Sequence, residues 1–143
     1  MSNTPKTIYL TREEYSRLKI YERRYRQQAR RVFTNRVAYY HQFTGGHYTS
    51  ITIRDQKSRW GSCSSRGTLS FNYRLVFAPP KVLDYVVVHE LCHLTHMNHS
   101  KDFWDMVERI MPDYQIHKQW LREHEPELTL TDHLAKQGIP IKL

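Results

Sequence analysis

The chain has little cysteine and no long apolar run, and each shortage excludes a class of protein. Its 143 residues include two cysteines, Cys63 and Cys92, too few for a disulfide framework, so we expect a cytoplasmic location. No apolar run approaches the ~20 residues of a membrane span, and residues 1–10 lack the apolar core of a signal peptide. We expect one domain over residues 1–143, with a core over residues 11–124 and a tail over residues 125–143.

Acidic side chains are fewer than basic ones, and the basic excess lies near the N-terminus. The formal net charge is +8, and nine basic against three acidic residues lie between Arg12 and Arg36. Such a surface is either a solvated helix face or a binding face for nucleic acid, nucleotide or acidic protein. The sequence contains no zinc-finger or RNP-type motif that would read bases.

The apolar pattern predicts an α+β fold. Thr11 and Glu14 match a capping box, which predicts a long helix, and Thr34 is a candidate cap for a second segment ending at Gly45. The period then changes to two, which predicts a mostly antiparallel sheet of three short strands at residues 51–54, 59–63 and 69–73. Further helices are expected over residues 80–97, with Pro80 in the first turn, after His99, with Ser100 as cap and Pro112 as the end, and from the candidate cap Asp113 through His124.

The clearest chemical pattern lies in the stretch Val86–His93 and its continuation to His99. His89 and His93 are four residues apart, so in a helix their imidazoles lie on one face, one turn apart. With Glu90 they form H-E-x-x-H, in which two histidines bind zinc and the glutamate is the general base. The alternative interpretation is a buried helix with two satisfied core histidines.

A catalytic zinc ion needs a third protein ligand. His96 lies on the same helical face, but it is about 10 Å along the axis from His89, too far to share one ion on a straight helix. Asn98 tolerates the left-handed conformation that ends helices, so the chain can reverse and return His99 to the ion. We therefore predict a Zn2+ site formed by His89, His93 and His99, with His96 outside the ligand set.

Several other polar side chains have a weaker pattern, and each has an ordinary packing or surface role as its alternative. Candidates for stabilising an oxyanion are Tyr114, His117, His96 and Arg74. Candidate hydrogen-bond partners of the ligand imidazoles are Asp84, Asp102 and Asp105. Cys92 projects away from the ligand face, and Cys63 is expected to be a structural thiol.

Six short runs of this sequence are specific in combination: Arg59–Cys63, Asn72–Leu75, Ala78–Pro80, Tyr85–His93, Asn98–Ser100 and Phe103-Trp104. Together they resemble the YgjP-like metallopeptidase family, which is related to the SprT and WLM zinc proteases. The resemblance covers roughly residues 12–120. It implies a small zincin-like domain in which His89, His93 and His99 bind zinc and Glu90 is the catalytic acid and base.

The resemblance favours zinc-dependent hydrolysis of peptide bonds, with a peptide or protein as substrate. Two alternatives stay open. SprT and WLM relatives are linked to proteolysis near DNA, so a nucleic-acid-associated protein with a zinc site is one. A YgjP-type member acts as a UTP pyrophosphatase, so nucleotide hydrolysis is the other. The chain has only five glycines and no glycine-rich loop to cradle phosphates, which disfavours a nucleotide substrate.

Overall fold

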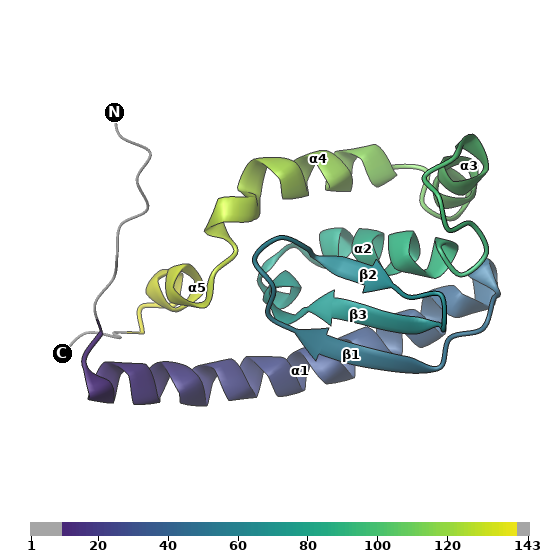
Figure 1. The fold of residues 1–143 in the computed structure, drawn as a ribbon. Coiled ribbons are helices and arrows are strands. Elements are labelled where there is room, and N and C mark those ends of the chain that lie inside the picture. Colours follow the sequence, from purple (N-terminus) through teal and green to yellow (C-terminus); the bar gives the residue numbers. More distant parts are fainter. Residues whose placement is uncertain (1–9, 140–143) are drawn as a thin grey trace.

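A computed structural model describes residues 10–139 of the chain. The elements follow the order α1 (Arg12–Thr44), β1 (Ser50–Arg54), β2 (Gly61–Cys63), β3 (Thr68–Asn72), η1 (Tyr73–Phe77), α2 (Pro80–Cys92), α3 (Lys101–Ile110), α4 (Tyr114–His124), η2 (Glu125–Glu127) and α5 (Leu130–Lys136) (Figure 1). The predicted α+β class is confirmed. The expectations for residues 1–9 and for residues 140–143 of the tail fall outside the residues that the structure describes.

The long helix α1 begins at the predicted capping box. The Thr11 hydroxyl accepts a hydrogen bond from the Glu14 backbone N–H at 3.1 Å, and the Glu14 carboxylate accepts one from the Thr11 N–H at 3.0 Å. The expected second segment from Thr34 is not separate, because α1 continues unbroken for 33 residues to Thr44. Its buried stripe consists of Ala29, Phe33, Val37 and Tyr40. This stripe faces the core and keeps the helix in one piece.

The three-stranded sheet has the order β1-β3-β2. Strands β2 and β3 are antiparallel, with Ser62 opposite Ser70, but β1 and β3 are parallel, with Ile51 opposite Leu69. The prediction of a mostly antiparallel sheet was therefore wrong, and the sheet is mixed. Each strand does reverse the direction of the one before it, as short connections dictate. Because β3 inserts between β1 and β2, it runs parallel to the first of them.

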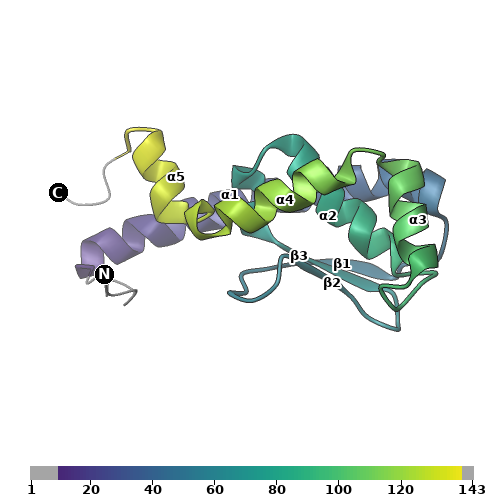
Figure 2. The same cartoon turned by 90° about the horizontal axis from the view of Figure 1, so that it is seen from above.

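Helices α1 and α2 cover one face of this sheet (Figure 2). Leu69 and Phe71 of β3 are fully buried, and the Phe71 ring stacks on Phe33 of α1 with a centroid distance of 4.5 Å. Val87 and Val88 of α2 are also fully buried. The core between helix and sheet thus fixes α2, which carries the histidine motif.

The C-terminal elements extend along the molecule from the histidine motif to the first half of α1 (Figure 1). Ser100 caps α3 as expected, since its hydroxyl accepts from the Phe103 N–H at 3.3 Å. Asp113 precedes α4 but makes no side-chain cap; its carboxylate pairs with His117 at 3.0 Å instead. The sequence pattern did not predict α5, which follows the Thr129 cap and contacts α1 through His133 and Tyr25.

The basic side chains of α1 are partly paired. Lys19 and Arg26 lie 3.2 and 3.9 Å from Glu22, and Arg36 lies 2.8 Å from Asp84 of α2. A groove of about 370 Å³ passes between this part of α1 and β1 and is lined by Lys19, Glu22, Arg23, Arg26, Gln27, Arg30 and Ile53. Binding of nucleic acid or nucleotide to α1 stays a prediction. Among the described residues, no helix combines the length and apolarity that a membrane span requires.

Candidate metal centre

Helix α2 aligns the first two histidines. Pro80 occupies its first turn, where a missing N–H costs nothing, and its interior from Val82 to Val88 is buried almost throughout. A helix held on so many sides cannot rotate, so the side chains of His89 and His93 project from one fixed face. The His89 side chain is 19 % exposed and His93 is buried. The motif therefore lies at the edge of the core, with one face towards solvent.

The chain leaves α2 earlier than the sequence predicts. The helix ends at Cys92, not near Met97, and tightens into hydrogen bonds three residues apart, such as Leu94 N–H to Leu91 C=O at 3.0 Å. The predicted left-handed Asn98 is also wrong, because no described residue other than glycine has a positive φ. The tighter turns reverse the chain without a left-handed residue. His96 consequently lies beyond the helix and not on its ligand face.

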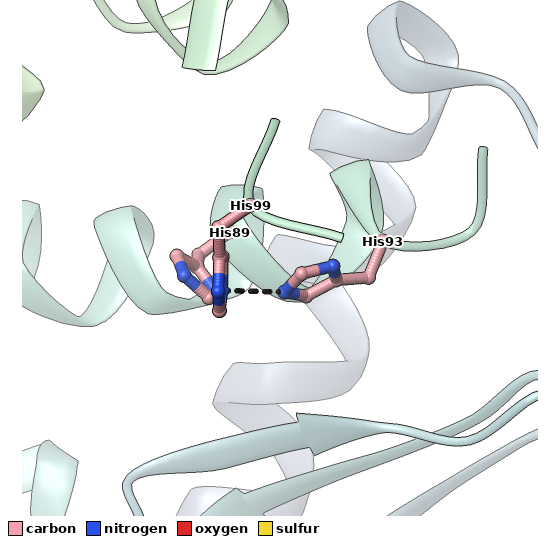
Figure 3. A group of neighbouring side chains, drawn as sticks. All are labelled: His89, His93 and His99. Atoms are coloured by element: carbon pink, nitrogen blue, oxygen red, sulfur yellow. Dashed lines mark hydrogen bonds between the residues drawn. The ribbon is translucent and has the colours of Figure 1, made fainter. Parts of the chain in front are cut away.

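The reversal brings His99 to His89 and His93 (Figure 3). One ring nitrogen from each lies within 4.8 Å of the others, and Nε2 of His93 and Nε2 of His99 are 3.1 Å apart. Two imidazole nitrogens on one tetrahedral zinc ion are about 3.3 Å apart, given Zn–N bonds of about 2.05 Å. The three side chains thus fit a metal ion in donor type, and the His93–His99 pair also matches it in spacing.

Two hydrogen bonds orient these imidazoles. Nδ1 of His93 lies 2.9 Å from the His96 carbonyl oxygen, so Nδ1 carries the proton and Nε2 keeps its lone pair. Nδ1 of His89 lies 3.2 Å from a Glu90 carboxylate oxygen. His96 therefore contributes to the site through its backbone, a role that its position in the sequence does not reveal.

Aromatic rings from α3 pack against the histidines, of which His99 stays exposed. Phe103, which is fully buried, stacks on His93 at 4.4 Å and meets His89 and His99 edge-on at 5.0 and 5.1 Å. Trp104 lies nearly parallel to His99 at 5.9 Å. From the sequence alone, these two residues were only one of the runs that resemble the family, with no role at the site. Both residues follow shortly after His99 and the Ser100 cap, and this position in the sequence is the signal that could have placed them at the site.

Burial lowers the pKa of His99, and the neighbouring charges of His89, His93 and Lys118 lower it further. A metal ligand must be a neutral imidazole. The environment of His99 therefore favours the form that binds a cation.

Glu90 is buried beside strand β2. It is 5 % exposed, and a Cβ atom added to Gly61 would lie 3.0 Å from both Cγ and Oε2 of Glu90. A larger residue at this position would require the strand or the carboxylate to move by a few tenths of an ångström. The next residue but one, Cys63, is half-buried, and burial together with the charge of Glu90 raises the pKa of its thiol to about 11. The thiol is thus protonated at neutral pH and is a poor metal ligand.

The other predicted polar residues are mostly engaged elsewhere. Asp84 accepts two hydrogen bonds from Arg36, at 2.8 and 2.9 Å, and one from the Tyr40 hydroxyl at 3.0 Å. Asp105 pairs with Lys101, and Asp102 is exposed. Arg74 donates to the carbonyls of Gln56 and Leu128. Of the four candidates for stabilising an oxyanion, Tyr114 is linked to the histidines through Trp104, on which its ring stacks at 5.4 Å.

Comparison with known proteins supports a peptidase fold. The YgjP-like metallopeptidase domain family matches residues 4–124. Among solved structures, the metallopeptidase zymogen of Pyrococcus abyssi abylysin superposes with a TM-score of 0.58 at 20% sequence identity, over 65% of this chain and 95% of that one. This likeness concerns the fold. No curated protein matches the chain. Since the family match covers most of the sequence, the chain belongs to the YgjP-like metallopeptidase family.

Proposed function

We propose that the chain is a zinc metallopeptidase whose ion is held by His89, His93 and His99 and whose general base is Glu90. The convergence of three ring nitrogens within 4.8 Å, beside a buried carboxylate, carries this proposal. Three imidazoles leave one position of a tetrahedral ion for water or substrate, whereas structural zinc sites usually close with four protein ligands. Imidazole donors also suit zinc among first-row metals.

The roles of the side chains follow from their positions. When bound, zinc would polarise the scissile carbonyl and bring the pKa of water to about 7. Glu90 would accept the proton of the attacking water and return it to the leaving amine. His96, through its carbonyl, holds His93 in the tautomer that presents Nε2. Phe103 fixes the His93 ring plane by stacking.

Strand β2 is the best-placed support for a substrate peptide. It is an edge strand in which Ser62 lies opposite Ser70, and the backbone bonds on either side of it join Asn72 N–H to Trp60 C=O at 2.8 Å and Ser64 N–H to Thr68 C=O at 3.0 Å. Backbone groups alternate along a strand, so those of Gly61 and Cys63 point away from β3. An extended peptide can add to this edge beside Glu90. β3 cannot serve, because it is the central strand.

The test combines metal analysis with an unbiased peptide-library digest. Purified wild-type protein should contain about one zinc ion per chain, cleave library peptides, lose activity with a chelator and regain it with zinc. His99→Ala should contain almost no zinc and cleave nothing. The matched control is His117→Ala, which removes an imidazole paired with Asp113.

Three results would contradict the proposal. They are full zinc content in His99→Ala, absence of cleavage by zinc-loaded wild type, and release of pyrophosphate from UTP without any peptide hydrolysis. The last would instead favour nucleotide hydrolysis.

A further inference from the structure

Helix α4 brings a cation to the edge of the metal centre. Tyr114 and Lys118 lie one turn apart on α4, and both contact the Trp104 indole: the Tyr114 ring at 5.4 Å and the Lys118 ammonium at 4.2 Å. Trp104 in turn contacts the rings of His99, at 5.9 Å, and His89, at 5.7 Å. One aromatic side chain therefore joins Lys118 to the histidines.

The described residues supply no counter-ion for Lys118. Elsewhere, Lys101 pairs with Asp105 at 2.8 Å and Lys19 with Glu22 at 3.2 Å. Lys118 is half-buried, and within residues 10–139 its ammonium contacts the face of Trp104 but no carboxylate. Its ammonium lies over the indole ring that also stacks on His99, so its charge is at the edge of the histidine cluster.

A positive charge at this place opposes the binding of a metal cation, because like charges repel most strongly where water is partly excluded. A charge such as that of Lys118, which is unfavourable in its surroundings, often marks a functional position. The cation–π contact with Trp104 holds the ammonium in place instead of letting it move into solvent. The arrangement therefore favours an anion that arrives with the substrate.

A peptide has two sources of such an anion: the side chain of Asp or Glu, and the C-terminal carboxylate. The contacts of 5.9 and 4.2 Å through Trp104 place the ammonium within about 10 Å of the His99 ring. An extended peptide rises about 3.3 Å per residue, so this distance corresponds to about three residues. A neutral backbone carbonyl would reach Lys118 equally well but would not compensate its charge.

We propose that Lys118, held against Trp104, binds a carboxylate of the substrate within about three residues of the cleaved bond. The preferred substrates are then peptides with an acidic side chain or a free C-terminus at that position. This inference rests on the proposed peptidase function and specifies its substrate class.

The test measures binding separately from cleavage. Peptides from the library digest are made in matched forms: Glu or Asp against Gln or Asn, and free against amidated C-terminus. Calorimetric affinities are measured on the zinc-loaded Glu90→Gln protein, which binds without cleaving, and kcat and KM on the active protein. The variants are Lys118→Met, Lys118→Arg and Lys118→Glu. Lys136→Glu, an exposed lysine on α5, is the control for net charge.

We expect Lys118→Met to weaken binding of the acidic form about tenfold and to raise its KM, with little change for the neutral form. Lys118→Arg should keep the preference, Lys118→Glu should reverse it in favour of the neutral form, and Lys136→Glu should behave as wild type. If Lys118→Met loses affinity in only one of the two matched pairs of peptides, that pair identifies whether a side-chain or a C-terminal carboxylate is bound.

Equal affinity of wild type and Lys118→Met for acidic and neutral forms would overturn the role of Lys118 and leave the peptidase proposal intact. Absence of cleavage of every peptide would contradict the peptidase proposal itself. Zinc content and thermal unfolding of each variant exclude a folding defect as the cause of weaker binding.

Discussion

Two histidine clusters in this molecule have nearly the same packing and different chemistry. His93 stacks on Phe103 with a centroid distance of 4.4 Å and an interplanar angle of 21°, and His133 stacks on Phe77 at 4.4 Å and 18°. Burial is the first cause of a lowered pKa in both regions, for His99 and for His133. Ring stacking and a lowered pKa are thus common to both clusters.

The difference lies in what the ring nitrogens meet. Nε2 of His133 lies 3.1 Å from the Tyr25 hydroxyl, which satisfies it within the fold. Nε2 of His93 lies 3.1 Å from Nε2 of His99, and two neutral imidazoles that both present lone pairs need a proton or a cation between them. Convergent ring nitrogens, and not ring stacking as such, are the feature that separates the proposed metal centre from the packing cluster.

The largest expected effect comes from replacing one histidine of each cluster by phenylalanine, which keeps the ring and removes the nitrogens. His93→Phe should lose almost all bound zinc and all hydrolysis, because two imidazoles cannot complete the site. His133→Phe should keep its zinc and lose about 0.5–1.5 kcal/mol of unfolding free energy with the Tyr25 hydrogen bond. Metal analysis and urea unfolding measure both. Equal zinc content in the two variants would contradict the claim that the His93 cluster binds zinc and the His133 cluster does not.

The stacking partners give the next largest effect. Phe103→Leu should weaken zinc binding about 10–100-fold, since groups that orient ligands usually contribute this much to metal affinity. Phe77→Leu makes the same change in the other cluster and should leave zinc affinity unaltered. Competition with a fluorescent chelator gives both affinities. An unchanged affinity in Phe103→Leu would mean that the ring only fills space.

Gly61→Ala tests how closely β2 must approach the metal centre. The added Cβ would lie 3.0 Å from Glu90 Cγ and Oε2 and from Val86 Cγ1, so strand or carboxylate must move. We expect turnover to fall about tenfold with zinc content unchanged, because small displacements of a reacting group are costly. Ser62→Ala, on the alternate face of the strand, is the control. Wild-type turnover in Gly61→Ala would show that Glu90 tolerates the displacement.

The smallest effect concerns pH in the α5 cluster. Burial, and to a lesser extent Lys136, lowers the pKa of His133 below its ordinary 6.5. The fold therefore prefers neutral His133: this stabilisation is fully present above pH 6.5 and is lost as the pH falls through the lowered folded-state value. Between about pH 7.5 and pH 5, wild type should lose more unfolding free energy than His133→Phe. Parallel urea titration curves would contradict this.

The sequence predicted those features that depend on local spacing. The Thr11 capping box, the Ser100 cap, the Pro80 entry to α2 and the convergence of His89 with His93 each follow from residues within one or two turns. The approach of His99 was predicted from the need for a third ligand, and the structure brings it to the other two. The predicted route was wrong, because the helix ends at Cys92 in tight turns.

Features that depend on tertiary contacts were not accessible from the sequence. The insertion of β3 between β1 and β2 separates two strands that are consecutive in the sequence, and short strands give no signal of their order. The stacking of Phe103 on His93, the turn of the His96 carbonyl towards His93, and the Lys118–Trp104 contact all join separate elements. Helix α5 has only seven residues and depends on its contacts with α1.

The most direct test of the account is zinc content and peptide turnover measured on the same samples of wild type and Glu90→Gln. We expect equal zinc, about one ion per chain, and turnover lowered about 10²–10⁴-fold in the variant, because the proposed role of Glu90 is to move protons and not to hold the metal. Undiminished turnover at equal zinc would contradict Glu90 as the general base, and loss of zinc in Glu90→Gln would contradict a site made of three histidines.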